Sequence, residues 1–84
     1  MNQVILSVKD TAAQAFGRPM FLPTPAVGLR SFREEINRKA DDNQMNKHPS
    51  DFELYELGSY DDSTGIIEVC EPRLVARAKD LIES

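Results

Sequence analysis

Cysteine, histidine and tryptophan are scarce in this chain, which has one Cys, one His and no Trp. The single cysteine, Cys70, excludes an internal disulfide framework, and Cys70 together with His48 is too small a set for a zinc site. The spacing places no nucleophile or orienting carboxylate beside His48, so acid–base catalysis has no evident centre. We therefore expect a protein that is not an enzyme and that carries no metal and no cofactor.

Long hydrophobic runs are also missing. No stretch reaches about 18 apolar residues, and the first ten residues have no basic segment ahead of their apolar ones, as a signal peptide would. With 84 residues the chain forms one domain, residues 1–84, with a small core to which dimerisation would add buried surface. We expect a cytosolic homodimer or larger oligomer that does not associate with membranes.

Basic residues are outnumbered, with 10 Lys and Arg against 14 Asp and Glu and a net charge of −4. The two halves differ. Residues 1–50 hold seven basic and five acidic residues, whereas residues 51–84 hold three basic and nine acidic ones. An acidic chain repels nucleic-acid phosphates, so the overall charge argues against non-specific DNA binding. The overall charge does not exclude a local basic face formed by the first half.

The first half predicts a strand and a helix. Residues 3–9 alternate between apolar and other side chains, which is typical of a strand, and residues 18–22 form a short extended piece between two prolines. Thr24 and Pro25 are a favourable N-cap and first residue for a helix that should run to about Ala40. Its apolar stripe consists of Leu29, Phe32, Ile36 and Ala40.

Three glycines mark special positions in the predicted helix and strands. Gly28 inside the helix costs roughly 0.5–1 kcal/mol relative to alanine and suggests close packing against another backbone. Residues 52–60 and 66–70 are predicted strands joined by an acidic turn in which Gly65 suits a positive φ. Gly58 suggests a bulge in the first of them, a strand that is apolar on both faces and therefore central or at a contact.

The C-terminal segment is ambiguous. Apolar residues within 73–82 follow a spacing that favours a short amphipathic helix, with a strand over residues 73–76 as the alternative. Residues 41–50 are polar and are expected to form a loop. The predicted fold class is α+β, a small antiparallel β-sheet of roughly three or four strands that ends in a C-terminal hairpin and packs against one main α-helix.

The side chains that could carry chemistry mostly have structural explanations. The acidic turn, residues 61–64, lacks the spacing of a calcium loop and is better explained by side-chain caps, and Cys70 is expected to be buried and inert. The helix charges can pair at i, i+4. If the chain binds single-stranded DNA, phosphate contacts would come from basic residues and base stacking from aromatic ones. The candidates are Arg18, Arg33, Arg38, Lys39 and Lys47, and the rings of Phe16, Phe21, Tyr55 and Tyr60.

The stretch from Lys47 to Asp62, KHPSDFELYELGSYDD, fits the pattern KHP-x-D-[FY]-x-L-[FY]-x-[LI]-G-x-[FY]-D-D. It resembles the small non-structural protein family of gokushovirus-type microviruses, which are single-stranded DNA phages. The segments ILSVKD and RPMFLP, the helix residues Arg30, Phe32 and Asn37, and Glu71 with Pro72 are similar as well. The resemblance covers nearly the whole chain. It implies a role in switching replication to single-strand synthesis and packaging in the host cell cytoplasm, and it assigns no binding residues.

Two classes of function follow. The leading hypothesis is a non-catalytic phage accessory protein, acting in viral DNA replication or genome packaging by binding single-stranded DNA or a phage or host replication protein. The alternative is a protein-interaction module that docks a host or phage protein through a sheet edge or its acidic half.

Overall fold

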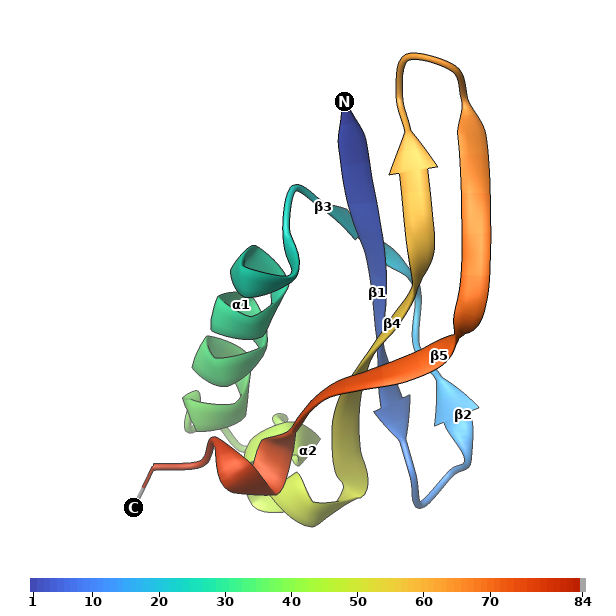
Figure 1. Ribbon diagram of the computed structural model, residues 1–84. Helices are drawn as coiled ribbons and strands as arrows, with labels where there is room; N and C mark the ends of the chain where they lie inside the picture. Colours follow the sequence, from blue (N-terminus) through green and yellow to red (C-terminus); the bar gives the residue numbers. More distant parts are fainter. Residues whose placement is uncertain (84) are drawn as a thin grey trace.

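The computed structural model describes residues 1–83 as an antiparallel sheet with one helix across one of its faces (Figure 1). The α+β class and the C-terminal hairpin predicted from the sequence are confirmed. The strands are β1 (Asn2–Asp10), β2 (Ala15–Phe16), β3 (Met20–Leu22), β4 (Phe52–Asp61) and β5 (Ile66–Arg77). The helices are α1 (Pro25–Asn37) and the short α2 (Gln44–Lys47), with 3₁₀ turns at Pro49–Asp51 and Ala78–Asp80. Among these residues no helix is long and apolar enough to cross a bilayer.

The central strand is β1. It pairs with β4 on one side, and on its other side it pairs with β2 near Lys9 and with β3 near Ile5, while β5 continues the sheet beyond β4. The edge beside β1 is therefore split into two short strands, and Pro19, which lacks a ladder donor, lies in the gap between them. The predicted bulge is confirmed, because the β1–β4 register shifts between Ile5 and Leu6, opposite Gly58 and Glu56.

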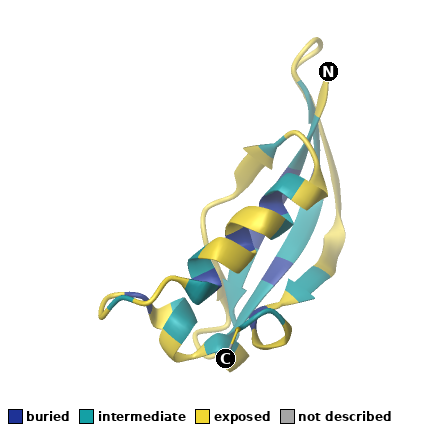
Figure 2. Cartoon of the chain, turned by 90° about the vertical axis from the view of Figure 1, so that its left-hand side faces the viewer, coloured by how far each residue is buried: buried dark blue, intermediate teal, exposed yellow. Residues whose placement is uncertain are grey.

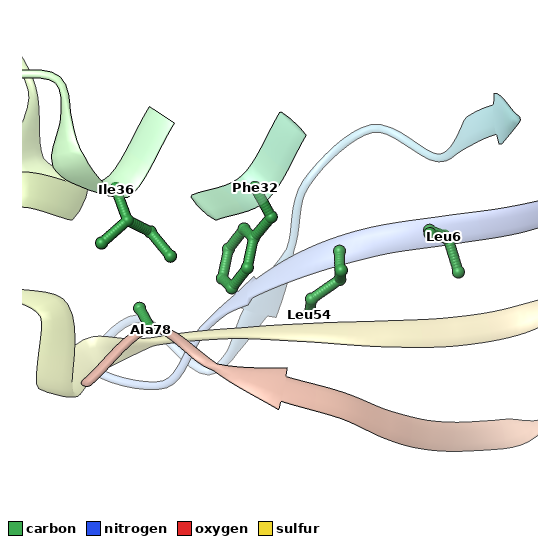
Figure 3. Close-up of a cluster of buried hydrophobic side chains, with 5 residues drawn as sticks. All are labelled: Leu6, Phe32, Ile36, Leu54 and Ala78. Carbon is green, nitrogen blue, oxygen red and sulfur yellow. The ribbon is translucent and has the colours of Figure 1, made fainter. Parts of the chain in front are cut away.

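The core lies between α1 and one face of the sheet. Its buried side chains come from β1, α1, β4 and the turn after β5, and they are Leu6, Phe32, Ile36, Leu54 and Ala78 (Figure 3). The predicted close packing at Gly28 is found, but against side chains and not against another backbone, because a Cβ built there would clash with Cδ1 of Leu6 and Cδ1 of Leu22. Figure 2 shows the buried positions of α1 on its sheet-facing side and exposed positions on its outer side. Thr24 caps the helix by accepting a hydrogen bond from the Val27 N–H.

The predicted helix is three residues too long, since α1 ends at Asn37 and not at Ala40. The reason is a set of asparagine side chains that take the carbonyls at its end. Nδ2 of Asn43 donates to the carbonyl oxygens of Glu35 (2.7 Å) and Arg38 (2.8 Å), and Nδ2 of Asn46 donates to that of Ile36 (2.9 Å). The predicted loop over residues 41–50 is wrong in part, because these contacts stabilise α2 within it.

The helix favoured for residues 73–82 is wrong, and the alternative strand is correct. Arg73, Leu74, Ala76 and Arg77 pair with β4, so β5 continues past an irregularity between Val69 and Arg73 and ends at Arg77, before the 3₁₀ turn. Two cross-strand ion pairs join these strands, Arg73 with Glu56 at 2.8 Å and the Arg77 side chain with Glu53 at 3.5 Å. Pairing with a long neighbouring strand thus overrides a helical spacing of apolar residues.

The turn between β4 and β5 has the predicted caps. Oδ1 of Asp61 accepts from the Ser63 N–H at 2.9 Å, Oγ1 of Thr64 accepts from the Ile66 N–H at 3.3 Å, and Gly65 has a φ of +76°. The expectation that Cys70 is buried is wrong, because Cys70 is exposed on β5. As the last strand of the sheet, β5 has no neighbour within residues 1–83 to cover its outer side.

Candidate nucleic-acid interface

The sheet face turned away from α1 carries four aromatic rings. Strand alternation separates the two faces: Leu6 and Val8 of β1 point into the core, whereas Ile5, Ser7 and Lys9 point to the other side. Residues directly opposite these on neighbouring strands share their face. The aromatic members of this open face are Phe16 of β2, Phe21 of β3, and Tyr55 and Tyr60 of β4.

The rings form two edge-to-face pairs that cross β1. The centroids of Phe16 and Tyr55 are 5.5 Å apart at an interplanar angle of 70°, and those of Phe21 and Tyr60 are 5.5 Å apart at 80°. Both phenylalanines stay accessible, with 42% of Phe16 and 48% of Phe21 exposed. Each tyrosine is half-buried. The open face therefore presents an apolar, ring-lined surface at the split edge of the sheet.

The layer beneath the rings is closed. Ile5 is 6% exposed and Ser7 is fully buried, although α1 lies on the opposite face. Oγ of Ser7 donates to the carbonyl oxygen of Gly17 at 2.8 Å, and the Gly17 N–H donates to the carbonyl oxygen of Val8 at 2.8 Å. These two hydrogen bonds hold the connection between β2 and β3 against β1. The backbone that carries Phe16 and Phe21 is therefore restrained.

Lys9 places a cation beside one of the two ring pairs. The Lys9 ammonium lies 5.4 Å from the centroid of Phe16 and 5.9 Å from that of Tyr55, within the range of cation–π attraction. Arg18 lies in the connection held by Ser7 and is exposed. The arrangement can stack on flat, unpaired rings and contact a small number of anions next to them.

The hydroxyl of Tyr55 donates to Oε1 of Glu53 at 2.9 Å. This hydrogen bond is the main cause of a raised Tyr55 pKa, and burial and the charge of Glu53 raise it further, against a lowering by Arg77. We expect Glu53→Gln to bring the pKa of Tyr55 back toward about 10, as followed by absorbance of the phenolate or by NMR. Because the folded-state pKa is raised, the associated stability is present at neutral pH and is lost as the pH rises through that raised value. An unchanged Tyr55 titration in Glu53→Gln would contradict the role of this bond.

The basic residues proposed from the sequence do not gather on the open face. Arg33 belongs to α1, Arg38 and Lys39 follow it, and Lys47 ends α2, so these four lie in the helical layer that covers the other side of the sheet. Arg38 is also engaged, pairing with Glu35 and, at 3.7 Å, with Asp42, and its pKa is raised chiefly by the hydrogen bond to Glu35. Of the five, only Arg18 lies at the aromatic side.

The four aromatic candidates, in contrast, are brought together. Lys9 is the residue that sequence reasoning missed as part of their site. A signal for it existed, because the alternation of residues 3–9 already put Lys9 on the face of β1 that the apolar core does not use.

The fold defines the class of this protein, and comparison with known proteins gives its family. The fold and the open face define a small α+β protein with an exposed aromatic sheet surface. Residues 3–81 match the family model of the Phage ORF5 protein, and because this match spans nearly the whole chain, the protein belongs to that phage family. No curated protein matches the chain significantly, and neither does any solved structure.

Proposed function

We propose that this protein is a non-catalytic accessory protein of gokushovirus-type microviruses that acts in viral DNA replication or genome packaging within the host cell. Membership of a phage family supports the first part. The pattern over residues 47–62, which resembles that of the gokushovirus proteins, supports the assignment to single-stranded DNA phages. The switch to single-strand synthesis is the stage at which a small protein that holds unpaired DNA would be needed.

The mode of action we propose is binding of single-stranded DNA on the open face. The observation that carries it is the presence of two ring pairs on one sheet face, Phe16–Tyr55 with Lys9 beside it and Phe21–Tyr60. Proteins that bind single strands combine rings for base stacking with cations for the backbone. Phe16 and Phe21 are the exposed stacking platforms, and Lys9 and Arg18 the cations for adjacent phosphates.

The charge of this face sets the expected salt dependence. With about two phosphates neutralised, the slope of log affinity against log salt should be about −1.4 for a single strand, so affinity falls roughly sevenfold between about 50 and 200 mM salt. Duplex DNA should bind more weakly because its bases are already stacked. Fluorescence anisotropy with a labelled single-stranded oligonucleotide measures both quantities.

Variants of the two phenylalanines test the site. Stacking is worth roughly 1–3 kcal/mol per base, so Phe16→Ala and Phe21→Ala should each weaken binding by about fivefold or more. Phe21→Leu is the matched variant that keeps an apolar side chain and loses the flat ring. Because both phenylalanines are partly exposed, the variants should keep the circular dichroism spectrum of the parent protein.

Arg33→Glu distinguishes the two placements of the site. On the open-face proposal this change, made in the helical layer, leaves affinity within about twofold of the parent. Loss of binding in Arg33→Glu together with full binding by the Phe16→Ala and Phe21→Ala variants would overturn the open-face site in favour of the helix cations. Absence of binding at low salt would overturn DNA binding as the function.

A further inference from the structure

The outer edge of β5 is open over its first half. Strand β5 is last in the sheet order, and no strand within residues 1–83 pairs with its outer side (Figure 1). Pro72 divides the strand, since a proline has no N–H to donate to a new neighbour. The part that can accept another strand is therefore the segment Ile66–Glu71, the β5 edge.

The β5 edge is apolar and exposed. The exposed fractions are 58% for Ile66, 52% for Ile67 and 84% for Val69, the last of which lies opposite Gly58 and so has no cross-strand side chain beside it. Proteins usually protect an open edge with lysines, bulges or a covering segment. Here Pro72 limits the length of the edge, and no lysine lies along it. Backbone groups and apolar side chains are thus both available for an added strand.

The charge around this edge selects the kind of strand. Residues 49–72 contain seven acidic residues and no Lys or Arg. Several of these acids are paired: Asp62 with the Met1 ammonium at 2.8 Å, Glu56 with Arg73, and Glu53 with Arg77. Glu68 and Glu71 form no ion pair with any part of the chain that the structure describes, and both are exposed. They flank Val69 and Cys70 and give the β5 edge a negative potential.

The same charge disfavours a second copy of this chain as the occupant. Pairing two β5 edges would bring the Glu68 and Glu71 carboxylates of both copies into one short ladder, and like charges across a ladder destabilise it. A strand that carries Lys or Arg among apolar residues is attracted to these carboxylates, whereas a second copy is repelled by them. Complementary charge also steers the encounter of two partners and suppresses wrong ones.

We propose that the β5 edge receives an extended basic segment of another protein as an added antiparallel or parallel strand. The backbone of residues 66–71 pairs with the segment, apolar side chains of the segment cover Ile67 and Val69, and its Lys or Arg side chains contact Glu68 on the other face, while Glu71 adds negative charge at the end of the edge. The backbone groups used lie at the outer side of β5, and Ile67 lies opposite Tyr60, so this surface borders the open face. The proposal does not depend on DNA binding.

A synthetic peptide tests the proposal with the full-length protein. The probe is a fluorescein-labelled six-residue peptide that alternates lysine and valine, compared with the same peptide in which glutamate replaces lysine. We expect the lysine peptide to bind and to slow amide hydrogen exchange of residues 66–71 in NMR spectra, while the glutamate peptide does not bind. The charge reversal E68K/E71K should weaken the lysine peptide at least tenfold and allow the glutamate peptide to bind.

The control variant is E34K/D41K, which makes the same change in net charge at exposed positions outside the β5 edge. It should leave the affinity for the lysine peptide within about twofold, once added salt has screened the long-range effect of the changed net charge. Equal weakening by both double variants would reduce the interaction to net charge and overturn the site. Undiminished binding of a lysine peptide methylated at all of its backbone nitrogens, which can donate to neither edge, would exclude strand pairing. Sedimentation as a dimer with residues 66–71 already protected would show that a second copy occupies the edge.

Discussion

Gly58→Ala is expected to destabilise the fold by about 3–5 kcal/mol, a large part of the total stability of a small domain. Gly58 has a φ of +156°, which an L side chain rarely adopts, and its position is fixed by the bulge opposite Ile5. A Cβ built there would lie 2.2 Å from the carbonyl oxygen of Glu68 and 3.1 Å from the Cα of Val69. Both are backbone atoms of the paired strand, so relief requires the β4–β5 ladder to separate. Urea denaturation followed by circular dichroism measures the loss.

Gly65→Ala is the matched control for this prediction. Gly65 also has a positive φ, +76°, but a Cβ at Gly65 meets no atom within 4 Å. Only the conformational cost remains, roughly 1–2 kcal/mol. If Gly58→Ala costs no more than Gly65→Ala, the bulge relaxes freely and the close approach of β5 to Gly58 is not a constraint. A glycine within the motif of residues 47–62 is thereby explained by packing, without a role in binding.

Asn43→Asp is expected to be the second most damaging of the substitutions considered, at about 3 kcal/mol or more at neutral pH. The Asn43 side chain is 4% exposed and gives both of its N–H groups to carbonyl oxygens, those of Glu35 and Arg38. An aspartate of nearly the same shape would place a carboxylate oxygen against these two acceptors in a buried site. The end of α1 and the start of α2 would lose their common anchor.

The pH dependence of this variant identifies the cause. Burial beside two carbonyl oxygens disfavours the charged form, so the pKa of the introduced aspartate should lie above its ordinary value. Stability of Asn43→Asp should then be greater at about pH 4 than at about pH 7, because the folded state retains the proton. Asn43→Ala, which loses two hydrogen bonds without adding charge, should cost about 1–3 kcal/mol with no such dependence. Equal stability of the two variants at neutral pH would contradict this account.

Local signals predicted most of the fold. The alternation of residues 3–9, the Thr24 cap followed by Pro25, and the glycine at the end of the 61–65 turn each depend on neighbouring residues alone, and each is found in the structure. The failures arise where distant residues decide. Residues 73–77 become a strand because β4 offers a ladder, and α1 stops at Asn37 because side chains from the following segment take its carbonyls.

The candidate site likewise has a part that the sequence could predict and a part that it could not. The four rings could be named from the sequence because aromatic residues are few, and their common face follows from strand alternation and register. The cations could not be placed, because Arg33, Arg38, Lys39 and Lys47 are assigned to a side of the sheet only by the packing of α1 and α2. Strand alternation placed Lys9 on the face away from the core, but its position opposite Phe16 follows only from the register between β1 and β2.

The order of strands also has a consequence for the folding kinetics. The β4–β5 hairpin closes through a short local turn, and its formation requires only contacts between residues near in sequence. In contrast, β1 pairs with β4 only after residues 2–10 meet residues 52–61, which lie 42 to 59 positions away along the chain. Such non-local pairing is slow because the loop-closure entropy is spent before the contacts form. We therefore expect the hairpin to form early and the insertion of β1 to limit the folding rate.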